Sequence, residues 1–288
     1  MTIDTTPKPQ ITSSMLGMFE RCGYQWLYRY GAKFGLAEGE QIIAPGIAAV
    51  VGTAVHKSVE VNLRHKMEKK ELLPLDAALD AGRDELVGIF SAGDVMFTEE
   101  EAANVDAAKG DAVDTVVSLA RLHYADVAPK INPVALEEPF VLKVPGCEFD
   151  LAGRKDIRQE DGSINDTKTK KTSPSASDGW TMQTRLYAYS ELIQRGSLPP
   201  RVTLNYLVKT KTPKLVDLIT EAKDMTMSPL FERLNNMVNT IEVAQYLRSK
   251  GKEEYPLTPA DSTTWVCTSK WCGYAHKGGC PFWSGRTE

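Results

Sequence analysis

The stretch from Gly153 to Lys171, GRKDIRQEDGSINDTKTKK, decides the fold and raises the question of function. The Asp-Gly pair in its middle predicts a tight turn between two strands, because this pair is typical of hairpin turns. Residues i and i+2 of a strand point to the same face, so Asp166 and Lys168 project together and Asp156 on the preceding strand can lie beside them. A half-buried hairpin needs only alternating apolar residues, so these charges require another explanation.

Metal-assisted hydrolysis of a phosphodiester is the chemistry that suits these three residues. Two converging carboxylates repel each other unless a cation lies between them. Oxygen ligands without a soft donor suit Mg²⁺ or Mn²⁺ better than zinc. A lysine beside them can orient a water molecule or offset charge that develops on a phosphoryl oxygen. The alternative is a solvated strand face that carries a surface ion pair between Asp166 and Lys168.

The helical segments predicted from periodicity lie mostly before this hairpin. A helix is expected over 12–31 behind a Ser/Thr cap, with Cys22 inside it. The next helix carries apolar residues at i, i+4 spacing, and two amphipathic helices follow over 74–92 and 98–128. We interpret the segment 46–130 as a helical insertion or lid.

The strand-like runs begin at Pro133 and favour an α/β or α+β fold with one central sheet. Three runs over 134–144, 147–158 and 163–169 predict an antiparallel meander. A helix capped by Ser177 or Asp178 and ended by Gly196 is expected next, then two strands and a final helix over 228–250. The segment 131–250 is therefore the predicted sheet core of a single domain that spans 1–288.

Composition sets wide limits on function. The chain has 288 residues, of which 42% are hydrophobic, and this is ordinary for a globular protein. Without a long apolar run or a signal-like start, we expect a cytoplasmic protein with no membrane association. The net charge of −4 does not exclude nucleic acid, because acids that hold metal can coexist with a positive face that includes Lys209, Lys211 and Lys214.

Two further motifs flank the hairpin. In GTAVH, residues 52–56, His56 lies one turn before Glu60 on a predicted helix, where a lone histidine is ordinarily a core or surface residue. In QTRLY, residues 183–187, Gln183 and Tyr187 share a helix face at i, i+4 spacing and can meet a nucleic-acid backbone.

The cysteines form a third pattern. Five cysteines in a chain without an export signal disfavour a disulfide framework. Cys267, Cys272 and Cys280 follow a C-x4-C-x7-C spacing, which leaves a four-ligand site one thiolate short, and Cys22 is the obvious fourth ligand. Zinc suits such a site, and His276 can replace one ligand, whereas Cys147 is expected to be an ordinary buried residue. We expect nearby aromatic residues to shield this site rather than to stack on bases: Trp265, Trp271, Tyr274, Phe282 and Trp283.

Taken in order, the histidine, the GxxD, DxK and QxxxY motifs and the terminal cysteines resemble the RecB-type branch of the PD-(D/E)XK nuclease superfamily. Within it the chain is most similar to the iron-sulfur nucleases, which include AddB-type subunits, the CRISPR-adaptation exonuclease and phage exonucleases. The resemblance spans Cys22 to Cys280 and implies a restriction-endonuclease-like core, with a central mixed sheet flanked by helices.

The resemblance also implies roles for single residues. His56, Asp156 and Asp166 would bind Mg or Mn, with the backbone carbonyl of Thr167 as a further ligand. Lys168 would act with both aspartates as the catalytic set, and Gln183 and Tyr187 would lie near the substrate. Glu60 and Glu137 are further acids that no spacing selects.

For the cysteines, the resemblance implies a 4Fe-4S cluster on Cys22, Cys267, Cys272 and Cys280. The cluster would act as a latch that joins 12–31 to 260–288. Relatives often carry a tighter C-x2-C-x5-C spacing, so zinc stays an alternative.

The function expected from this resemblance is a Mg- or Mn-dependent deoxyribonuclease. It would be an exonuclease that works from DNA ends, with single-stranded DNA in its channel, in recombination, repair or CRISPR-adaptation-like processing. Its partners would be DNA and proteins of those systems, in a bacterial cytoplasm or, for a phage protein, the host cytoplasm. The alternatives are a non-catalytic DNA-end-binding subunit and a zinc-stapled RNA-processing nuclease. The three converging charged residues favour catalysis, because a binding module has no physical reason to keep them.

Overall fold

The computed structural model describes residues 8–144, 148–252, 254–261, 265–268, 272–276 and 280–282. The predictions for Cys147, Trp271 and Trp283, and for the side chains of Trp265 and His276, lie outside this described part. The chain packs as two compact units. The first comprises residues 1–43, 141–153 and 226–288, and the second comprises residues 44–140 and 154–225.

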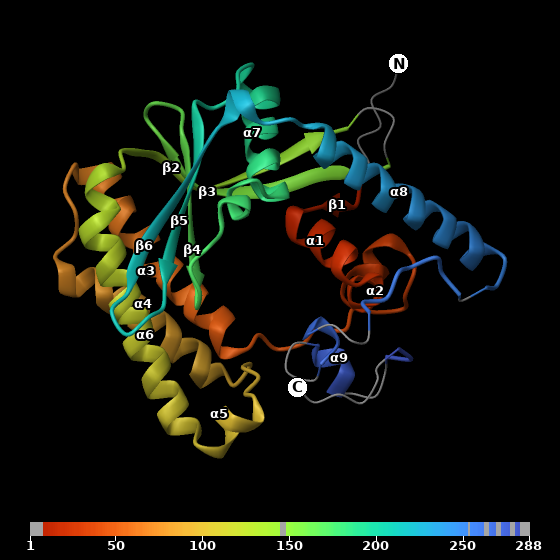
Figure 1. Cartoon of the computed structure of the whole chain (residues 1–288), viewed down its shortest axis with the longest axis horizontal. Helices are drawn as coiled ribbons and strands as arrows, with labels where there is room; N and C mark the ends of the chain where they lie inside the picture. The colour runs from red at the N-terminus through yellow and green to blue at the C-terminus, as the bar shows by residue number, and fades with distance from the viewer. Residues whose placement is uncertain are drawn as a thin grey trace. The chain divides into compact units, whose positions relative to one another are not determined.

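A mixed sheet runs through the second unit (Figure 1). Its strands are β2 (Pro133–Lys143), β3 (Asp150–Gln159), β4 (Ile164–Lys170), β5 (Arg201–Val208) and β6 (Lys214–Glu221). The order is β3-β4-β5-β6, with β2 also paired to β3. The β3-β4 and β5-β6 pairs are antiparallel, whereas β4 and β5 are parallel. The predicted central mixed sheet flanked by helices is confirmed.

The quoted hairpin forms as its residues predict. Ile157 on β3 lies opposite Asn165 on β4. Gly162 has a φ of 82°, a left-handed conformation that glycine adopts without steric cost, and the Ser163 amide donates to Asp161 Oδ1 at 2.9 Å. The turn therefore sets the register that carries Asp156 and Asp166 into adjacent strands.

Helices α3 (Ile47–Lys69), α4 (Leu75–Ala92) and α6 (Val105–Asp126) pack together in the second unit (Figure 1). The i, i+4 residues of α3 are buried in a core that also contains Leu119, Ile157 and Leu207. The helix predicted over 98–128 is wrong in one respect, because a short α5 (Glu99–Ala103) ends before Asn104. The Asn104 side chain accepts a hydrogen bond from the Ala107 amide and so starts a new helix.

Helix α7 (Met182–Arg195) begins later than predicted. Its N-cap is Thr181, whose hydroxyl accepts from the Thr184 amide at 3.1 Å, rather than Ser177 or Asp178. Asp178 instead closes a separate 3-10 turn, Ala176–Gly179, by accepting from the Ser175 amide. The predicted end is confirmed, since Gly196 has a φ of 79°.

The first unit contains α1 (Ser13–Arg21), α2 (Gly23–Tyr30), α8 (Ser228–Ser249), the short α9 (Gly273–His276) and β1 (Gln10–Ile11), which pairs in parallel with the start of β3. The prediction that Cys22 lies inside one helix is wrong, because its φ of −162° and ψ of 107° are extended. The next residue, Gly23, donates its amide to Thr258 O at 2.8 Å, and a Cβ there would lie 3.0 Å from Leu257 Cβ. This close approach of residues 257–258 interrupts the helix at Cys22.

Within the described residues, no helix combines the length and apolar character needed to cross a membrane.

Candidate active site

Helix α3 brings His56 against the sheet. A Cβ on Gly52 would lie 3.3 Å from Thr169 Oγ1, so glycine allows α3 to approach β4 closely one turn before the histidine. His56 Nδ1 lies 3.3 Å from Asp156 Oδ2. Burial lowers the pKa of His56, and the Asp166 carboxylate opposes this effect only in part. The imidazole is therefore held in its neutral form, which is the form that binds metal.

The surroundings of Asp156 disfavour its ionised form. Burial, and then the nearby Asp166 carboxylate, raise the pKa of Asp156 to about 8. Its Oδ2 accepts from the Thr167 amide at 3.4 Å, and the nearby Lys168 ammonium opposes the rise in pKa only in part. The site therefore favours either a proton or a cation at this position.

Glu137 is a further candidate metal ligand, which the sequence analysis did not single out. His56, Glu137 and Asp156 each offer one ligand atom, and these atoms lie within 4.8 Å of one another. Glu137 has a φ of 51°, although it stands in strand β2, and a left-handed non-glycine residue costs about 1 to 3 kcal/mol. Burial raises the pKa of Glu137 as well. Such strain at a cluster of acids is typical of a functional site, and no sequence signal shows it.

Of the side chains predicted as metal ligands, His56 and Asp156 belong to this group, whereas Asp166 makes other contacts. Its Oδ1 accepts from Tyr187 Oη at 3.0 Å and from Gln183 Nε2 at 3.3 Å. Its Oδ2 lies 2.6 Å from Lys168 Nζ. Asp166 is completely buried, so a surface ion pair does not describe it. The structure thus brings together Asp166, Lys168, Gln183 and Tyr187, beside the group that contains Asp156.

Glu60 and the histidines of α3 and α6 other than His56 have ordinary environments. Glu60 lines the same small cavity as His56, and hydrogen bonds from Arg64 help to lower its pKa. His123 is buried in α6, and burial lowers its pKa to about 3. His65 lies 3.9 Å from Glu71 near the end of α3. None of these contacts adds a reactive group to the site.

A small cavity lies between these groups, with about 220 Å³ of empty space that includes open solvent. Its polar lining comes from the His56, Glu137 and Asp156 group, from Glu60 and from Thr167. The two carboxylates suit Mg²⁺ or Mn²⁺, whereas the imidazole is a ligand that zinc and iron also accept. The residues present therefore fit a divalent cation.

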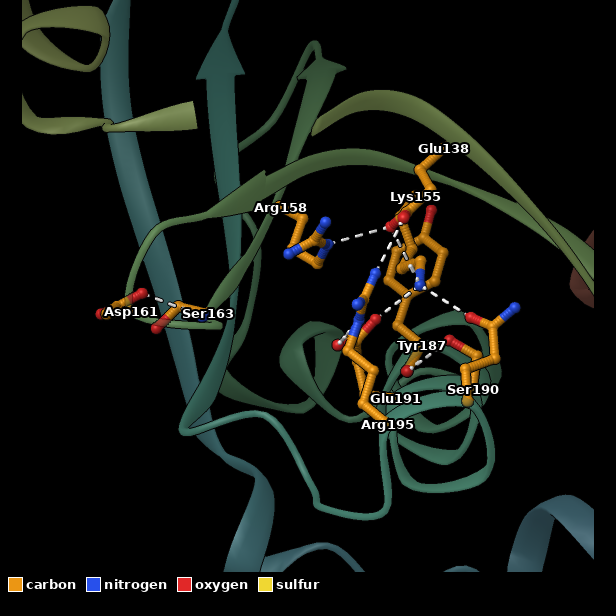
Figure 2. Close-up of polar contacts among 10 residues, drawn as sticks. Glu138, Lys155, Arg158, Asp161, Ser163, Tyr187, Ser190, Glu191 and Arg195 are labelled. Atoms are coloured by element: carbon orange, nitrogen blue, oxygen red, sulfur yellow. Dashed lines mark hydrogen bonds and ion pairs between the residues drawn. The ribbon is translucent and has the colours of Figure 1, made fainter. Parts of the chain in front are cut away.

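A buried ion-pair network holds α7 in place (Figure 2). Lys155 is completely buried, and its Nζ lies 2.5 Å from Glu191 Oε1 and 3.2 Å from Glu138 Oε2. Arg195 also contacts both glutamates, at 2.9 Å each. Sequence reasoning gave this lysine no role, although it immediately precedes Asp156.

The ring of Phe140 contacts both Lys155 and Tyr187 of the active site. Lys155 Nζ lies 5.5 Å from the centroid of the Phe140 ring. Phe140 packs edge-on against Tyr187, with ring centroids 6.5 Å apart. Because Tyr187 donates to Asp166, the network fixes the helix that orients this carboxylate.

In the first unit, the four predicted cysteine ligands line one cavity, which has about 310 Å³ of empty space that includes open solvent. These are Cys22, Cys267, Cys272 and Cys280. Burial raises the pKa of the Cys280 thiol, and the neighbouring cysteines act in the same direction. Tyr274 and Phe282 line the cavity as well, and Tyr274 packs on Tyr28 with ring centroids 5.1 Å apart.

Comparison with known proteins agrees with this geometry. The model of the PD-(D/E)XK nuclease superfamily matches residues 10–281. The chain belongs to the PD-(D/E)XK nuclease superfamily. The superfamily predicted from the motif order is therefore confirmed, and its hydrolytic nuclease chemistry applies to this chain.

Solved structures support the fold of this superfamily member. The chain is similar to a crystal structure from Eubacterium rectale that bears the name "Putative exonuclease". The TM-score is 0.50 at 15% identity, over 90% of this chain and 87% of that chain, so the likeness concerns the fold. A structure of SSO0001 gives a TM-score of 0.33 at 15% identity, over 90% of this chain and 95% of that chain, which is too loose for any argument. No curated protein matches the sequence.

Replacing the buried lysine should unfold the nuclease far more easily than replacing an exposed one. Lys155→Met leaves Glu138 and Glu191 without their buried cation, so we expect a loss of about 3 to 5 kcal/mol in the free energy of unfolding, measured with urea. Arg83→Met, which removes an exposed ion pair with Asp80, should cost less than about 1 kcal/mol. The double variant Lys155→Met/Glu191→Leu should recover much of the loss. An equal effect of the Lys155 and Arg83 substitutions would contradict this role.

The raised pKa of Asp156 predicts how the cation-free protein responds to pH. Between pH 4 and pH 8 the folded state binds more protons at Asp156 than the unfolded state, so stability should fall as pH rises through this range. Relative to Asp156→Asn, the wild type in EDTA should lose melting temperature from pH 5 to pH 8, and Mn²⁺ in excess over the EDTA should reverse this loss at pH 8. Asp156→Asn should weaken both responses, and a variant with the same pH dependence as the wild type would refute the assignment.

Proposed function

We propose that this chain is a divalent-metal-dependent DNA exonuclease that acts at DNA ends and holds a single strand in its active site. The observation that carries the proposal is the buried Asp166, paired with Lys168 and fixed by Tyr187, beside the His56, Glu137 and Asp156 group. Membership of the superfamily supports nucleic acid as the substrate. The name of the Eubacterium rectale neighbour supports exonuclease activity.

His56, Glu137 and Asp156 would hold the cation, and Asp166 and the Thr167 carbonyl remain proposed as further ligands. A bound Mg²⁺ or Mn²⁺ supplies positive charge for a phosphoryl oxygen and acidifies water. The carboxyl groups bind the cation only in their ionised form, and the imidazole binds it only in its neutral form. Metal binding therefore releases protons, so it should strengthen as pH rises.

Lys168 is the proposed catalytic cation of the chain itself. Its side chain is 31% exposed, whereas its partner Asp166 is completely buried. The ammonium group can therefore keep its contact with Asp166 and donate to a water molecule or a phosphoryl oxygen on the open side. Gln183 and Tyr187 hold Asp166 by donating to its other oxygen, so that Oδ2 stays directed at Lys168.

We also propose a 4Fe-4S cluster on Cys22, Cys267, Cys272 and Cys280, which would place the chain in the iron-sulfur branch of the superfamily. The support is that all four cysteines line one cavity, with Tyr28, Tyr274 and Phe282 around it. Thiolates bind iron-sulfur clusters and zinc, so the metal itself must be measured. This branch is linked to recombination, repair and CRISPR adaptation, which are the processes we propose for the protein and its partners.

Removal of the proposed catalytic groups should abolish cleavage without unfolding the protein. We expect Lys168→Met and Asp166→Asn each to reduce cleavage of end-labelled single-stranded DNA in Mn²⁺ at least about 100-fold. Asp161→Asn is the matched control, because asparagine keeps the oxygen that accepts from the Ser163 amide and this exposed position should leave the rate unchanged. Products mapped from each labelled end, with duplex DNA and RNA in parallel, would report polarity and substrate class. Retained cleavage by both active-site variants would contradict the mechanism.

Anaerobic purification should give a brown protein that contains about four iron and four sulfide per chain. Cys267→Ser should lose both, whereas Cys147→Ser, at the cysteine outside the proposed ligand set, should keep them. A colourless protein with one zinc per chain would overturn the cluster assignment and leave the active-site proposal standing.

A further inference from the structure

A cleft opens at the carboxyl ends of the parallel strands β4 and β5, within the second unit. Its walls come from the first turns of α3, from α6 and from the strand ends, and its empty space is about 530 Å³ with open solvent included. Lys170 on β4 lies opposite Val208 on β5, and the Lys209 amide donates to Lys170 O at 2.7 Å. The parallel pairing therefore places lysines from two strands at one edge of the sheet.

The cleft follows the same strand that carries the catalytic lysine. Thr169, which lines it, directly follows Lys168 and approaches Gly52 on α3. Residues of a strand advance about 3.3 Å each, so Lys168 and Lys170 are separated by about 7 Å along β4. Lys168 and Thr169 project from opposite faces of β4, so a strand of nucleic acid that is cut beside Lys168 would pass the end of β4 to enter the cleft, within about two nucleotides.

Two of the cleft's lysines are available for a ligand. Lys171 and Lys209 are both exposed, and no ion pair joins either of them to a carboxylate of the described residues. Lys170 already has two partners in the protein, because its Nζ lies 3.1 Å from Asp178 and 5.5 Å from the centroid of the Tyr206 ring. The lysine pair thus presents two positive charges on one rim.

The remaining lining suits the face of a base. Val51 and Leu119 close the bottom of the cleft as core residues, and Ile47 and Ala48 supply its more exposed apolar surface. The one acid of the lining, Glu101, has its carboxylate bound to the Thr98 amide at 2.8 Å in a helix cap. A positively charged rim that follows the phosphates is one component of a site for single-stranded nucleic acid, and the apolar lining beside it can contact a base.

We propose that this cleft binds the one or two nucleotides of a single strand that adjoin the scissile phosphodiester. Lys171 and Lys209 contact their phosphates, and Ile47 and Ala48 contact one unstacked base. The inference rests on the proposed nuclease function and adds to it the place where the rest of the strand lies.

Charge reversal of the two lysines tests this cleft. Lys171→Glu/Lys209→Glu should weaken binding of fluorescein-labelled dT12 at least 10-fold and reduce the slope of log K against log salt by about 1.4, or 0.7 per phosphate contact. The matched control is Lys69→Glu/Lys130→Glu, which makes the same change in net charge at exposed positions. Because α3 spans Ile47–Lys69, Lys69 lies about 33 Å from the cleft end of this helix. The control should bind dT12 like the wild type.

A small phosphodiester substrate tests the proposed nuclease activity separately from binding in the cleft. Hydrolysis of bis(p-nitrophenyl) phosphate in Mn²⁺ needs only the metal group and Lys168, so the cleft variant should keep the wild-type rate while cleavage of dT12 falls. A cleft variant that binds and cuts dT12 like its control would overturn the cleft alone. A larger loss of binding for a blunt 12-bp duplex than for dT12 would overturn the single-strand assignment. A wild type that cleaves neither dT12 nor the small diester would overturn the proposed function together with the cleft.

Discussion

Repulsion between the buried carboxylates Asp156 and Asp166 is the constraint on which the rest of the structure depends. Burial and mutual proximity push the pKa of Asp156 to about 8, and Glu137 adds a third acid nearby. Such a group is stable only if donors and cations surround it from several elements. Lys168 provides one cation, and a divalent metal would provide the other.

Two packing features hold these acids in position. Gly52 lets α3 approach β4, so that the neutral His56 reaches Asp156. On the other side, the buried Lys155 fixes α7 through Glu191, and α7 directs Tyr187 at Asp166. Charge in the site and packing around it are therefore coupled, because the lysine that anchors α7 immediately precedes the central aspartate.

Local rules predicted the hairpin and the shared faces of the site residues, but they missed the helix caps at Asn104 and Thr181. The hairpin turn follows from Asp161 and Gly162, the shared face of Asp166 and Lys168 from strand alternation, and the pairing of Gln183 with Tyr187 from helical spacing. Contacts with distant segments could not be predicted in this way. The break at Cys22 depends on the close approach of residues 257–258, and the left-handed conformation of Glu137 is a property of the folded backbone. For this reason the sequence did not select Glu137 for the observed group, and the roles of the site residues remain proposals.

The central claim is that His56, Glu137 and Asp156 form a cation site that relieves this repulsion. Calorimetric titration of Mn²⁺ into the protein at pH 8, with Glu137→Gln as the test variant and Asp161→Asn as its control, examines it most directly. The account predicts saturable binding to the wild type and the control, and at least about 10-fold weaker binding to Glu137→Gln. Unchanged affinity in Glu137→Gln would contradict it.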